Sequence, residues 1–214
     1  NNKKNLIIVG GTGFYLKALV DGISYLPVAS NKNKKIVNEK LKNIQEAYLF
    51  VNKLDTKYME NIKSNDKYRI EKALTLYFTT NKTPTDYFRA NPKEPLAANL
   101  PIFEIVWDKE ILKKRIAKRT NIMIKDGIID EVIYLEKAYT RTPSCMATIG
   151  ISETLDYLDN KLSKTQLEEK ITQNTIKLAK NQRTFNNGQF SNIRQFNLEN
   201  IKNQILLEFD NNLE

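Results

Sequence analysis

The hydrophobic pattern begins with a short apolar run that leads into a glycine turn. Residues 5–9 (Asn-Leu-Ile-Ile-Val) are almost wholly apolar and end at Gly10. Because both faces of such a run are apolar, it predicts a buried strand of a parallel sheet. Residues 14–20, after the glycines, are predicted to form a helix, so this region resembles half of a β-α-β unit.

Helical periodicity dominates the next part of the chain. A lysine-rich stretch predicts one helix over residues 32–50. Ser64-Asn65-Asp66 is a helix-capping sequence and precedes a predicted helix over residues 68–78. Residues 79–100 contain three of the six prolines and are predicted to form a loop.

The remaining residues predict two more strands among four helices. The strands are expected at residues 101–107 and 193–196. The expected helices are residues 109–125, 128–139, 164–185 and 201–209, and a turn at Thr142-Pro143 precedes the segment of residues 144–159. In the longest helix, Ile171, Leu178 and Phe185 follow at heptad spacing.

These elements predict an α/β protein with a parallel sheet core and a mostly helical insertion domain. Residues 1–29 and 99–214 are expected to form the core, and residues 30–98 the insertion. Two or three strands make a small parallel sheet. We therefore expect the N-terminal strands of the core to be missing from these residues.

Composition excludes several kinds of chemistry. The chain has no histidine and one cysteine, Cys145, which rules out a His/Cys zinc site, an imidazole general base and an internal disulfide. No apolar run approaches the length that spans a bilayer. We expect a soluble, cytoplasmic protein that does not bind membranes.

Positive charge points to a polyanionic partner. The chain has 34 Lys and Arg against 25 Asp and Glu, and residues 171–198 contain no acid at all. Lys177, Lys180 and Arg183 repeat every third residue there, among glutamines and asparagines. Such a face suits a nucleic acid, although a solvated helix face has the same composition.

The glycine turn is a candidate phosphate site. Gly10-Gly11-Thr12-Gly13 lies where a predicted strand meets a helix N-terminus, whose free N–H groups attract anions. Thr12 adds a hydroxyl donor. The spacing matches neither the Walker A pattern nor the dinucleotide fingerprint, so a purely structural tight turn is an equal alternative.

Two further clusters carry candidate binding chemistry. Arg115 and Arg119 are one turn apart on a predicted helix and could grip a diphosphate, although a basic surface helix also explains them. Arg69 and Lys72 lie beside Tyr68, and an aromatic ring among bases suits RNA. An ordinary capped helix with a mixed surface explains this second group equally well.

Taken in order, these segments resemble the tRNA dimethylallyltransferases, also called tRNA isopentenyltransferases. The most specific match is the string from Val9 to Leu19, Val-Gly-Gly-Thr-Gly-Phe-Tyr-Leu-Lys-Ala-Leu. Further matches follow collinearly over about residues 5–187: Asp21-Gly22, Leu26-Pro27, Asn65-Asp66, Arg69, Ala73-Leu74, Arg115-Ile116, Arg119, Met123, Gly127, Ile149-Gly150, Glu153, Ala179-Lys180, Gln182 and Thr184-Phe185.

The resemblance implies a reaction, a fold and roles for these residues. It implies transfer of a dimethylallyl group from dimethylallyl diphosphate to the exocyclic amine of the adenosine 3′ of the anticodon in tRNA. It also implies a P-loop, nucleotide-binding type of core, Mg²⁺ as the cofactor, and a monomer that binds the anticodon stem-loop. Thr12 and Arg119 are the implied catalytic residues. The implied diphosphate-binding residues are Gly10, Gly11, Thr12, Arg115 and Arg119.

The resemblance also implies a set of tRNA-binding residues. They fall in four segments of the chain: Lys34; Tyr68, Arg69, Ile70, Glu71 and Lys72; Ala147, Thr148, Ile149 and Gly150; and Lys180, Gln182 and Arg183.

The sequence departs from the family pattern in ways that bear on activity. The family's P-loop and catalytic aspartate lie upstream of the glycine turn, and no Walker A pattern occurs in these 214 residues. Ile151, Ser152 and Asn181 replace an aromatic residue and two basic residues of the family motifs. We therefore expect a truncated chain that is inactive alone, with a non-catalytic tRNA-binding relative as the alternative. A nucleotide kinase, which shares the core, is disfavoured by the missing Walker A pattern.

Overall fold

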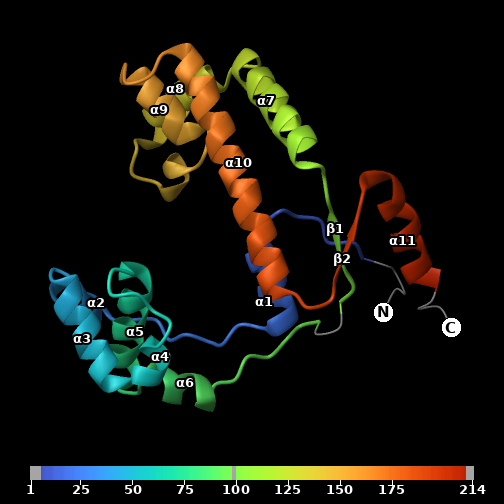
Figure 1. The fold of residues 1–214 in the computed structure, drawn as a ribbon. Helices are drawn as coiled ribbons and strands as arrows, with labels where there is room; N and C mark the ends of the chain where they lie inside the picture. Colours follow the sequence, from blue (N-terminus) through green and yellow to red (C-terminus); the bar gives the residue numbers. More distant parts are fainter. Residues whose placement is uncertain (1–5, 98–99, 211–214) are drawn as a thin grey trace. The chain divides into compact units, whose positions relative to one another are not determined.

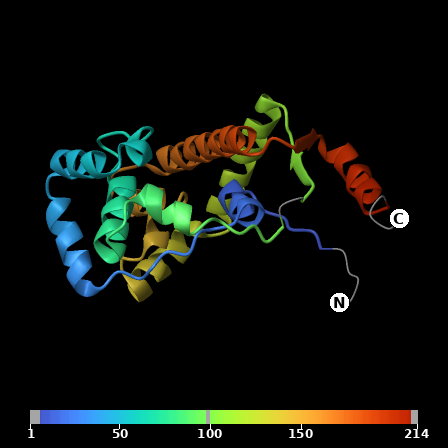
Figure 2. The same ribbon diagram turned by 90° about the horizontal axis from the view of Figure 1, so that it is seen from below.

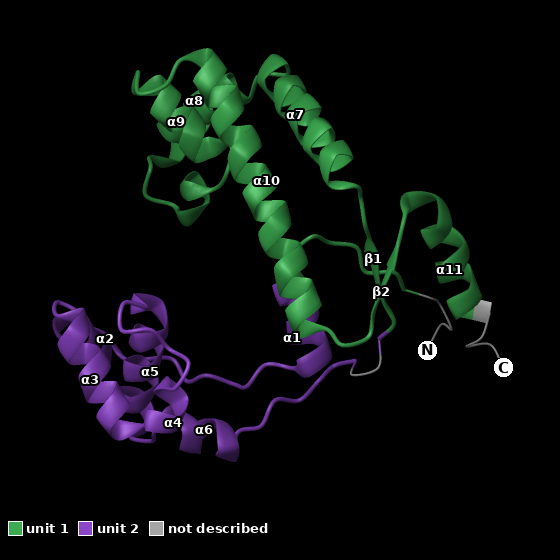
Figure 3. Cartoon of the chain, viewed as in Figure 1, with its two compact units in different colours: residues 1–13, 101–214 green, residues 14–100 purple. Residues whose placement is uncertain are grey.

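The computed structural model describes residues 6–97 and 100–210. The chain divides into two compact units (Figure 3): unit 1 contains residues 1–13 and 101–214, and unit 2 contains residues 14–100. Each unit has its own buried apolar cluster. The proposed division into a core of residues 1–29 and 99–214 and an insertion of residues 30–98 stays a prediction.

Unit 2 is built of helices. α1 (Gly13–Asp21) begins at the boundary between the units, and the backbone N–H of Leu96, near the end of unit 2, donates to the carbonyl of Leu19 in α1 (3.1 Å). The other helices are α2 (Asn31–Lys40), α3 (Ile44–Leu54), the single turn α4 (Thr56–Met59), α5 (Lys67–Thr80) and α6 (Pro84–Ala90).

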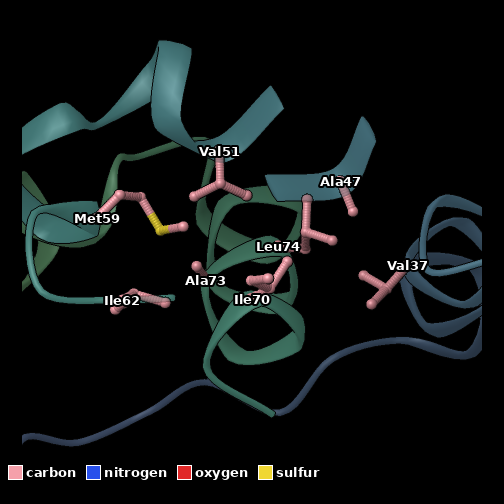
Figure 4. Close-up of a cluster of buried hydrophobic side chains, with 8 residues drawn as sticks. All are labelled: Val37, Ala47, Val51, Met59, Ile62, Ile70, Ala73 and Leu74. Atoms are coloured by element: carbon pink, nitrogen blue, oxygen red, sulfur yellow. The ribbon is translucent and has the colours of Figure 1, made fainter. Parts of the chain in front are cut away.

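The core of unit 2 forms around α5. Ile70, Ala73 and Leu74 recur at helical spacing on one face of α5 and are at most 1 % exposed. Figure 4 shows these side chains among Val37 of α2, Ala47 and Val51 of α3, and Met59 and Ile62. The helix predicted over residues 68–78 is therefore confirmed as α5.

Unit 1 contains a two-stranded parallel sheet and a set of helices. β1 (Ile102–Ile105) pairs with β2 (Ile193–Phe196), in a register that places Ile102 opposite Ile193 and Ile105 opposite Phe196. The helices are α7 (Lys109–Lys125), α8 (Ile128–Tyr139), the 3₁₀ turn Ser144–Ala147, α9 (Ile151–Leu158), α10 (Lys164–Gln189) and α11 (Leu198–Asp210).

The long helix α10 organises unit 1. Leu167 and Ile171, near its start, are buried with Ile124 of α7, and a second cluster joins α8 to α9 through Val132, Met146 and Leu155. Figures 1 and 2 both show α10 as one continuous helix that runs from the α8–α9 pair towards β2. It therefore connects the small helical layer of unit 1 to the sheet.

The predicted strand over residues 5–9 is wrong for the part that the structure describes. Residues 6–9 form no strand, and their side chains are 56–89 % exposed. The physical reason is the lack of a neighbour, because within the described residues the sheet consists of β1 and β2 paired with each other. An apolar run becomes a strand only where another strand supplies hydrogen-bond partners. Asn5 lies outside the described residues.

The predicted single helix over residues 32–50 is also wrong, because α2 ends at Lys40 and α3 starts at Ile44. Asn43 separates them as an N-cap. Its Oδ1 accepts from the backbone N–H of Glu46 (3.3 Å), and its Nδ2 donates to Oε1 of Glu46 (2.7 Å). Asparagine is among the preferred caps because its side chain satisfies a free N–H of the first turn.

Residues 79–100 are not simply a loop, since they contain α6. Pro84 stands in its first turn and Thr83 caps it, an arrangement that favours a helix. A tertiary contact then fixes α6: buried Asp55 accepts from the backbone N–H and from the hydroxyl of Thr85, both at 2.7 Å. Proline interrupts a helix in its interior but is tolerated in the first turn, and Pro84 begins α6.

The predicted helices of unit 1 are largely confirmed. Residues 109–125 and 128–139 form α7 and α8 with the predicted bounds, and the predicted strand at residues 193–196 is β2. Of the three residues at heptad spacing on α10, Ile171 is buried, whereas Leu178 is 44 % exposed, because the buried residues of α10 lie in its first turns. Across the described part of the chain, no helix is long and apolar enough to cross a membrane.

Candidate functional site

The glycine turn lies against the last turns of α10. A Cβ atom on Gly11 would stand 3.2 Å from Nε2 of Gln182, and one on Gly13 would stand 2.9 Å from Cδ1 of Phe185 and closer still to Oδ1 of Asn186. Position 13 therefore requires glycine because a side chain would collide with α10. Thr12, between these two contacts, is exposed. The backbone of the turn thus packs against α10 at Gly11 and Gly13, while Thr12 stays accessible to solvent.

The two arginines of α7 lie on its exposed side. Ile116, Thr120 and Ile124 form the buried side of the helix, so Arg115 and Arg119 are directed away from it. The guanidinium of Arg115 lies over the ring of Trp107, 4.3 Å from its centroid. This cation–π contact restricts the orientation of the Arg115 side chain. The four-residue spacing of Arg115 and Arg119 gave no indication of this contact.

The three residues of α10 that the resemblance assigns to tRNA binding divide between two surroundings. Lys180 and Arg183 are exposed, whereas Gln182 is half-buried against Gly11. Residues assigned to tRNA binding and to diphosphate binding are therefore brought together in unit 1, because Gln182 contacts the glycine turn directly. This proximity depends on a contact between residues far apart in the sequence.

Residues 147–150 lead from the last residue of the 3₁₀ turn Ser144–Ala147 into α9. Ala147, Thr148 and Ile149 are exposed, and Gly150 is buried with a φ of 96°. That φ value belongs to the left-handed region, which favours glycine. The segment therefore presents three residues to solvent from a fixed backbone.

Glu153 holds this segment in place. It is 4 % exposed, and one of its carboxylate oxygens accepts from the backbone N–H of Gly150 (2.7 Å) and from the hydroxyl of Ser152 (3.0 Å). The other oxygen accepts from Nδ2 of Asn174 on α10 (2.5 Å). Burial by itself would raise the pKa of Glu153, but the bonds from Asn174 and Gly150 outweigh it, and the pKa is lowered.

Replacing Glu153 by glutamine should destabilise unit 1 by about 2 kcal/mol, because the new NH₂ group faces donors instead of accepting from them. Since the pKa of Glu153 is lowered by folding, its contribution is complete above the unfolded pKa and is lost as the pH falls through the folded pKa. Urea unfolding at neutral and at acidic pH measures both effects. The variant should lose less stability in acid than the parent chain does.

Glu169→Gln is the matched control for this prediction. Glu169 lies on α10 and is exposed, so the same change removes a charge without removing a buried acceptor. Equal destabilisation by the two substitutions would contradict the role given to Glu153.

Unit 2 carries the remaining candidate residues on α2 and α5. Tyr68, Arg69 and Lys72 are exposed at the start of α5, and Nζ of Lys72 lies 5.3 Å from the centroid of the Tyr68 ring. Glu71 is half-buried beside them. Ile70 is fully buried in the core, so its side chain supports α5 from within.

Lys34 lies towards the opposite end of α5. Asn33, its neighbour on α2, donates from Nδ2 to the carbonyl of Phe78 (2.9 Å). Phe78 follows Tyr68 by about 15 Å along α5, at 1.5 Å per residue. The structure therefore does not bring Lys34 together with Tyr68, although both are exposed on unit 2.

Across the described residues no cluster of three or more Asp, Glu, Cys or His side chains could hold a metal ion. Magnesium is commonly held by one or two carboxylates together with substrate phosphates, so it needs no all-protein cage.

Fold and site together define an α/β protein in which a glycine turn lies against a basic helix. Solved structures share this fold. The chain superposes with a TM-score of 0.72 on a eukaryotic dimethylallyltransferase acting on tRNA (22% identical, 88% of this chain and 50% of that one). It superposes with a TM-score of 0.54 on a tRNA isopentenylpyrophosphate transferase from Staphylococcus epidermidis (24% identical, 94% of this chain and 67% of that one).

The chain belongs to the IPP transferase family, whose model matches residues 1–189. It is 59% identical to a tRNA dimethylallyltransferase of Aliarcobacter butzleri over 208 residues. This matched region covers 97% of this chain and 69% of the relative. It is 49% identical over 208 residues to one of Sulfurovum sp., with the same coverage of both chains. The family resemblance seen in the sequence is thereby confirmed.

The chain is shorter than the proteins it matches. It spans 69% of the Aliarcobacter butzleri relative and 57% of a solved tRNA isopentenylpyrophosphate transferase from Bacillus halodurans, whose TM-score with this chain is 0.52 at 23% identity. The activity of the relatives therefore passes to this chain only as a proposal.

Proposed function

We propose that this chain serves the transfer of a dimethylallyl group from dimethylallyl diphosphate to the exocyclic amine of the adenosine 3′ of the anticodon in tRNA. Family membership and the names of the relatives support the reaction. The observation that carries the proposal is the packing of the glycine turn on α10, where Gln182 contacts Gly11 within one turn of exposed Lys180 and Arg183. An anion-binding turn and a basic helix face thus meet in one unit.

The protein's chemical task in this reaction is to stabilise a leaving group. When diphosphate departs from an allylic carbon, the carbon centre is stabilised by its double bond, whereas negative charge collects on the diphosphate. Backbone N–H groups of Gly10 and Gly11, the hydroxyl of Thr12 and the guanidinium groups of Arg115 and Arg119 are the donors we assign to that charge. None of these groups requires histidine, which the chain lacks.

The exposed residues of both units are assigned to tRNA. Lys34, Arg69, Lys72, Lys180 and Arg183 supply charge for phosphates, and Tyr68 supplies a ring for an unstacked base. The acceptor adenine must leave the anticodon-loop stack to reach the diphosphate. Magnesium would arrive with the diphosphate, and the P-loop type of core, nucleotide binding, the monomeric state and the cytoplasmic location stay predictions.

The 214 residues alone should bind an anticodon stem-loop weakly and transfer little or no dimethylallyl group, since they contain no Walker A pattern. Binding should weaken steeply with salt, because phosphate contacts release counterions. Replacing Lys180 and Arg183 together by alanine should reduce the logarithmic salt slope by about 1.5. Fluorescence titration at several salt concentrations measures the slope, and labelled dimethylallyl diphosphate measures transfer.

Lys164 and Lys170, which are exposed near the start of α10, provide the matched double substitution for this test. Their replacement should change the salt slope less. A flat salt response in the parent chain would contradict RNA binding through phosphates, and efficient transfer by the 214 residues would contradict the expected inactivity.

A tRNA-binding relative without chemistry is the second candidate. It is favoured by Ile151 and Asn181, which stand where the family motifs carry an aromatic and a basic residue. Replacing Thr12 by alanine separates the two candidates in a chimera that places these residues behind the P-loop segment of a transferase. If Thr12 serves catalysis, the substitution lowers transfer. If the chimera binds tRNA without transfer and the substitution leaves that affinity unchanged, the binding relative is favoured.

A further inference from the structure

A polar network joins β1, β2 and the end of α10 in unit 1. Oε1 of Glu104 on β1 accepts from Nδ2 of Asn186 (2.7 Å), and Oε2 of Glu104 accepts from Nε2 of Gln195 on β2 (2.7 Å). The same nitrogen of Gln195 also lies 3.0 Å from Oδ1 of Asn187, as a donor to it. Two strands therefore fix the orientation of one amide on α10.

Asn186 is directed at the glycine turn. With its NH₂ group engaged by Glu104, its Oδ1 occupies the place where a Cβ of Gly13 would stand. Oδ1 is buried, and within the described parts of the chain no donor lies within hydrogen-bond distance of it. A buried acceptor without a donor is unfavourable by itself, so this orientation is imposed by the bond to Glu104.

Two neighbouring residues of α10 also pack against the glycine turn. Phe185 lies on the other side of Gly13, and Gln182 contacts Gly11 one turn earlier. The turn therefore has contacts at Gly11 and Gly13, while Thr12 between them is exposed. Because Gly11 and Gly13 have no side chains of their own, the position of the turn depends on groups that α10 supplies.

We propose that Asn186, held by Glu104 and Gln195, is a positioning residue for the Gly10–Gly13 turn and sets how well that turn binds diphosphate. The choice of diphosphate as the ligand rests on the proposed function. The ordering of the Gly10–Gly13 turn by Asn186 does not depend on it. Asn186 acts through Gly13 and touches no reacting atom. A shifted Gly13 misdirects the backbone N–H groups and the Thr12 hydroxyl, whose alignment decides the strength of anion binding.

Two variants of the 214-residue chain test the proposal with inorganic diphosphate as the probe. Asn186→Asp places a carboxylate against Glu104 and beside Gly13, so diphosphate affinity should fall at least tenfold. Asn187→Asp adds the same charge one residue later, and its carboxylate still accepts from Gln195, so its affinity should fall less than threefold. Equal losses in the two variants would overturn the proposal, because charge near the turn would then explain both.

Hydrogen exchange of the free protein tests the positioning without any ligand. Asn186→Ala should speed amide exchange at residues 11–13 at least tenfold relative to Asn187→Ala. The midpoint of thermal unfolding is measured for both variants, so that a general loss of stability is recognised. Faster exchange with no diphosphate binding in any chain would refute the proposed function and keep the positioning role. Unchanged exchange at residues 11–13 would refute the positioning role whatever the diphosphate affinity. Glu104→Ala, which removes the acceptor for Asn186, should speed exchange at residues 11–13 as Asn186→Ala does.

Discussion

Replacing Arg119 by alanine should lower dimethylallyl transfer about 100- to 1000-fold. Its guanidinium is exposed on α7 and is the implied donor to the leaving diphosphate, whose charge grows towards the transition state. Removal of one such preorganised donor costs about 10²–10³ in kcat. The measurement is single-turnover transfer of labelled dimethylallyl to an anticodon stem-loop, in a chimera that joins this chain behind the P-loop segment of a transferase.

Lys118→Ala provides the control for Arg119→Ala. Lys118 is the preceding residue of α7, is also exposed and carries the same charge, but it is not assigned to the diphosphate. Its substitution should change transfer by less than about tenfold, as expected for an exposed charge that is screened by solvent. Equal losses at the two positions would show that only the general charge of α7 matters. Arg119→Lys should recover part of the rate, because a lysine keeps the charge without the bidentate geometry.

Local signals explain why so many helices could be predicted from the sequence. Asp108 caps α7 by accepting from the N–H groups of Glu110 (2.8 Å) and Ile111 (3.1 Å), and Gly127 follows the helix end in a left-handed conformation. Both signals lie within a few residues of the boundary they set. Where capping and periodicity agreed, as in α7 and α8, the predicted bounds match the structure.

Two of the wrong predictions, the strand at residues 5–9 and the loop at residues 79–100, have one physical cause: the deciding contact lies far away in the sequence. The run Leu6–Val9 has the composition of a strand but no strand beside it in the described sheet. The helix α6 is fixed by Asp55, 30 residues before Thr85. A pattern of residue types carries no information about such partners.

The candidate site shows the same limit. The glycine turn and the arginine pair were identified from their own spacing, but the groups that support them were not. Trp107 under Arg115, Asn186 behind Gly13 and Asn174 on Glu153 became recognisable only through the fold. A signal existed for one of them, because Trp107 is the only tryptophan of the chain and stands just before the basic helix. For the two asparagines the abundance of asparagine in this sequence hides any signal.

Replacing Leu74 by alanine should lower the stability of unit 2 by about 3 kcal/mol. Leu74 is 0 % exposed on α5 and lies in the cluster with Val37 of α2 and with Ala47 and Val51 of α3, so truncation leaves a cavity between these helices. Buried leucine-to-alanine changes cost about 2.7–5 kcal/mol. Urea unfolding followed by circular dichroism measures the loss, and Leu49→Ala, on the exposed side of α3 at 55 % exposure, should cost less than about 1 kcal/mol.

The same substitution also tests whether the two units unfold separately. Trp107, the only tryptophan, belongs to unit 1, while every residue of the Leu74 cluster belongs to unit 2. Because the lost contacts are confined to unit 2, we expect the circular dichroism transition to shift while the tryptophan fluorescence transition shifts less. An equal shift in both would mean that the units unfold as one cooperative body. An unchanged circular dichroism transition would contradict the assignment of Leu74 to the core, and with it the support of α5 beneath Tyr68 and Lys72.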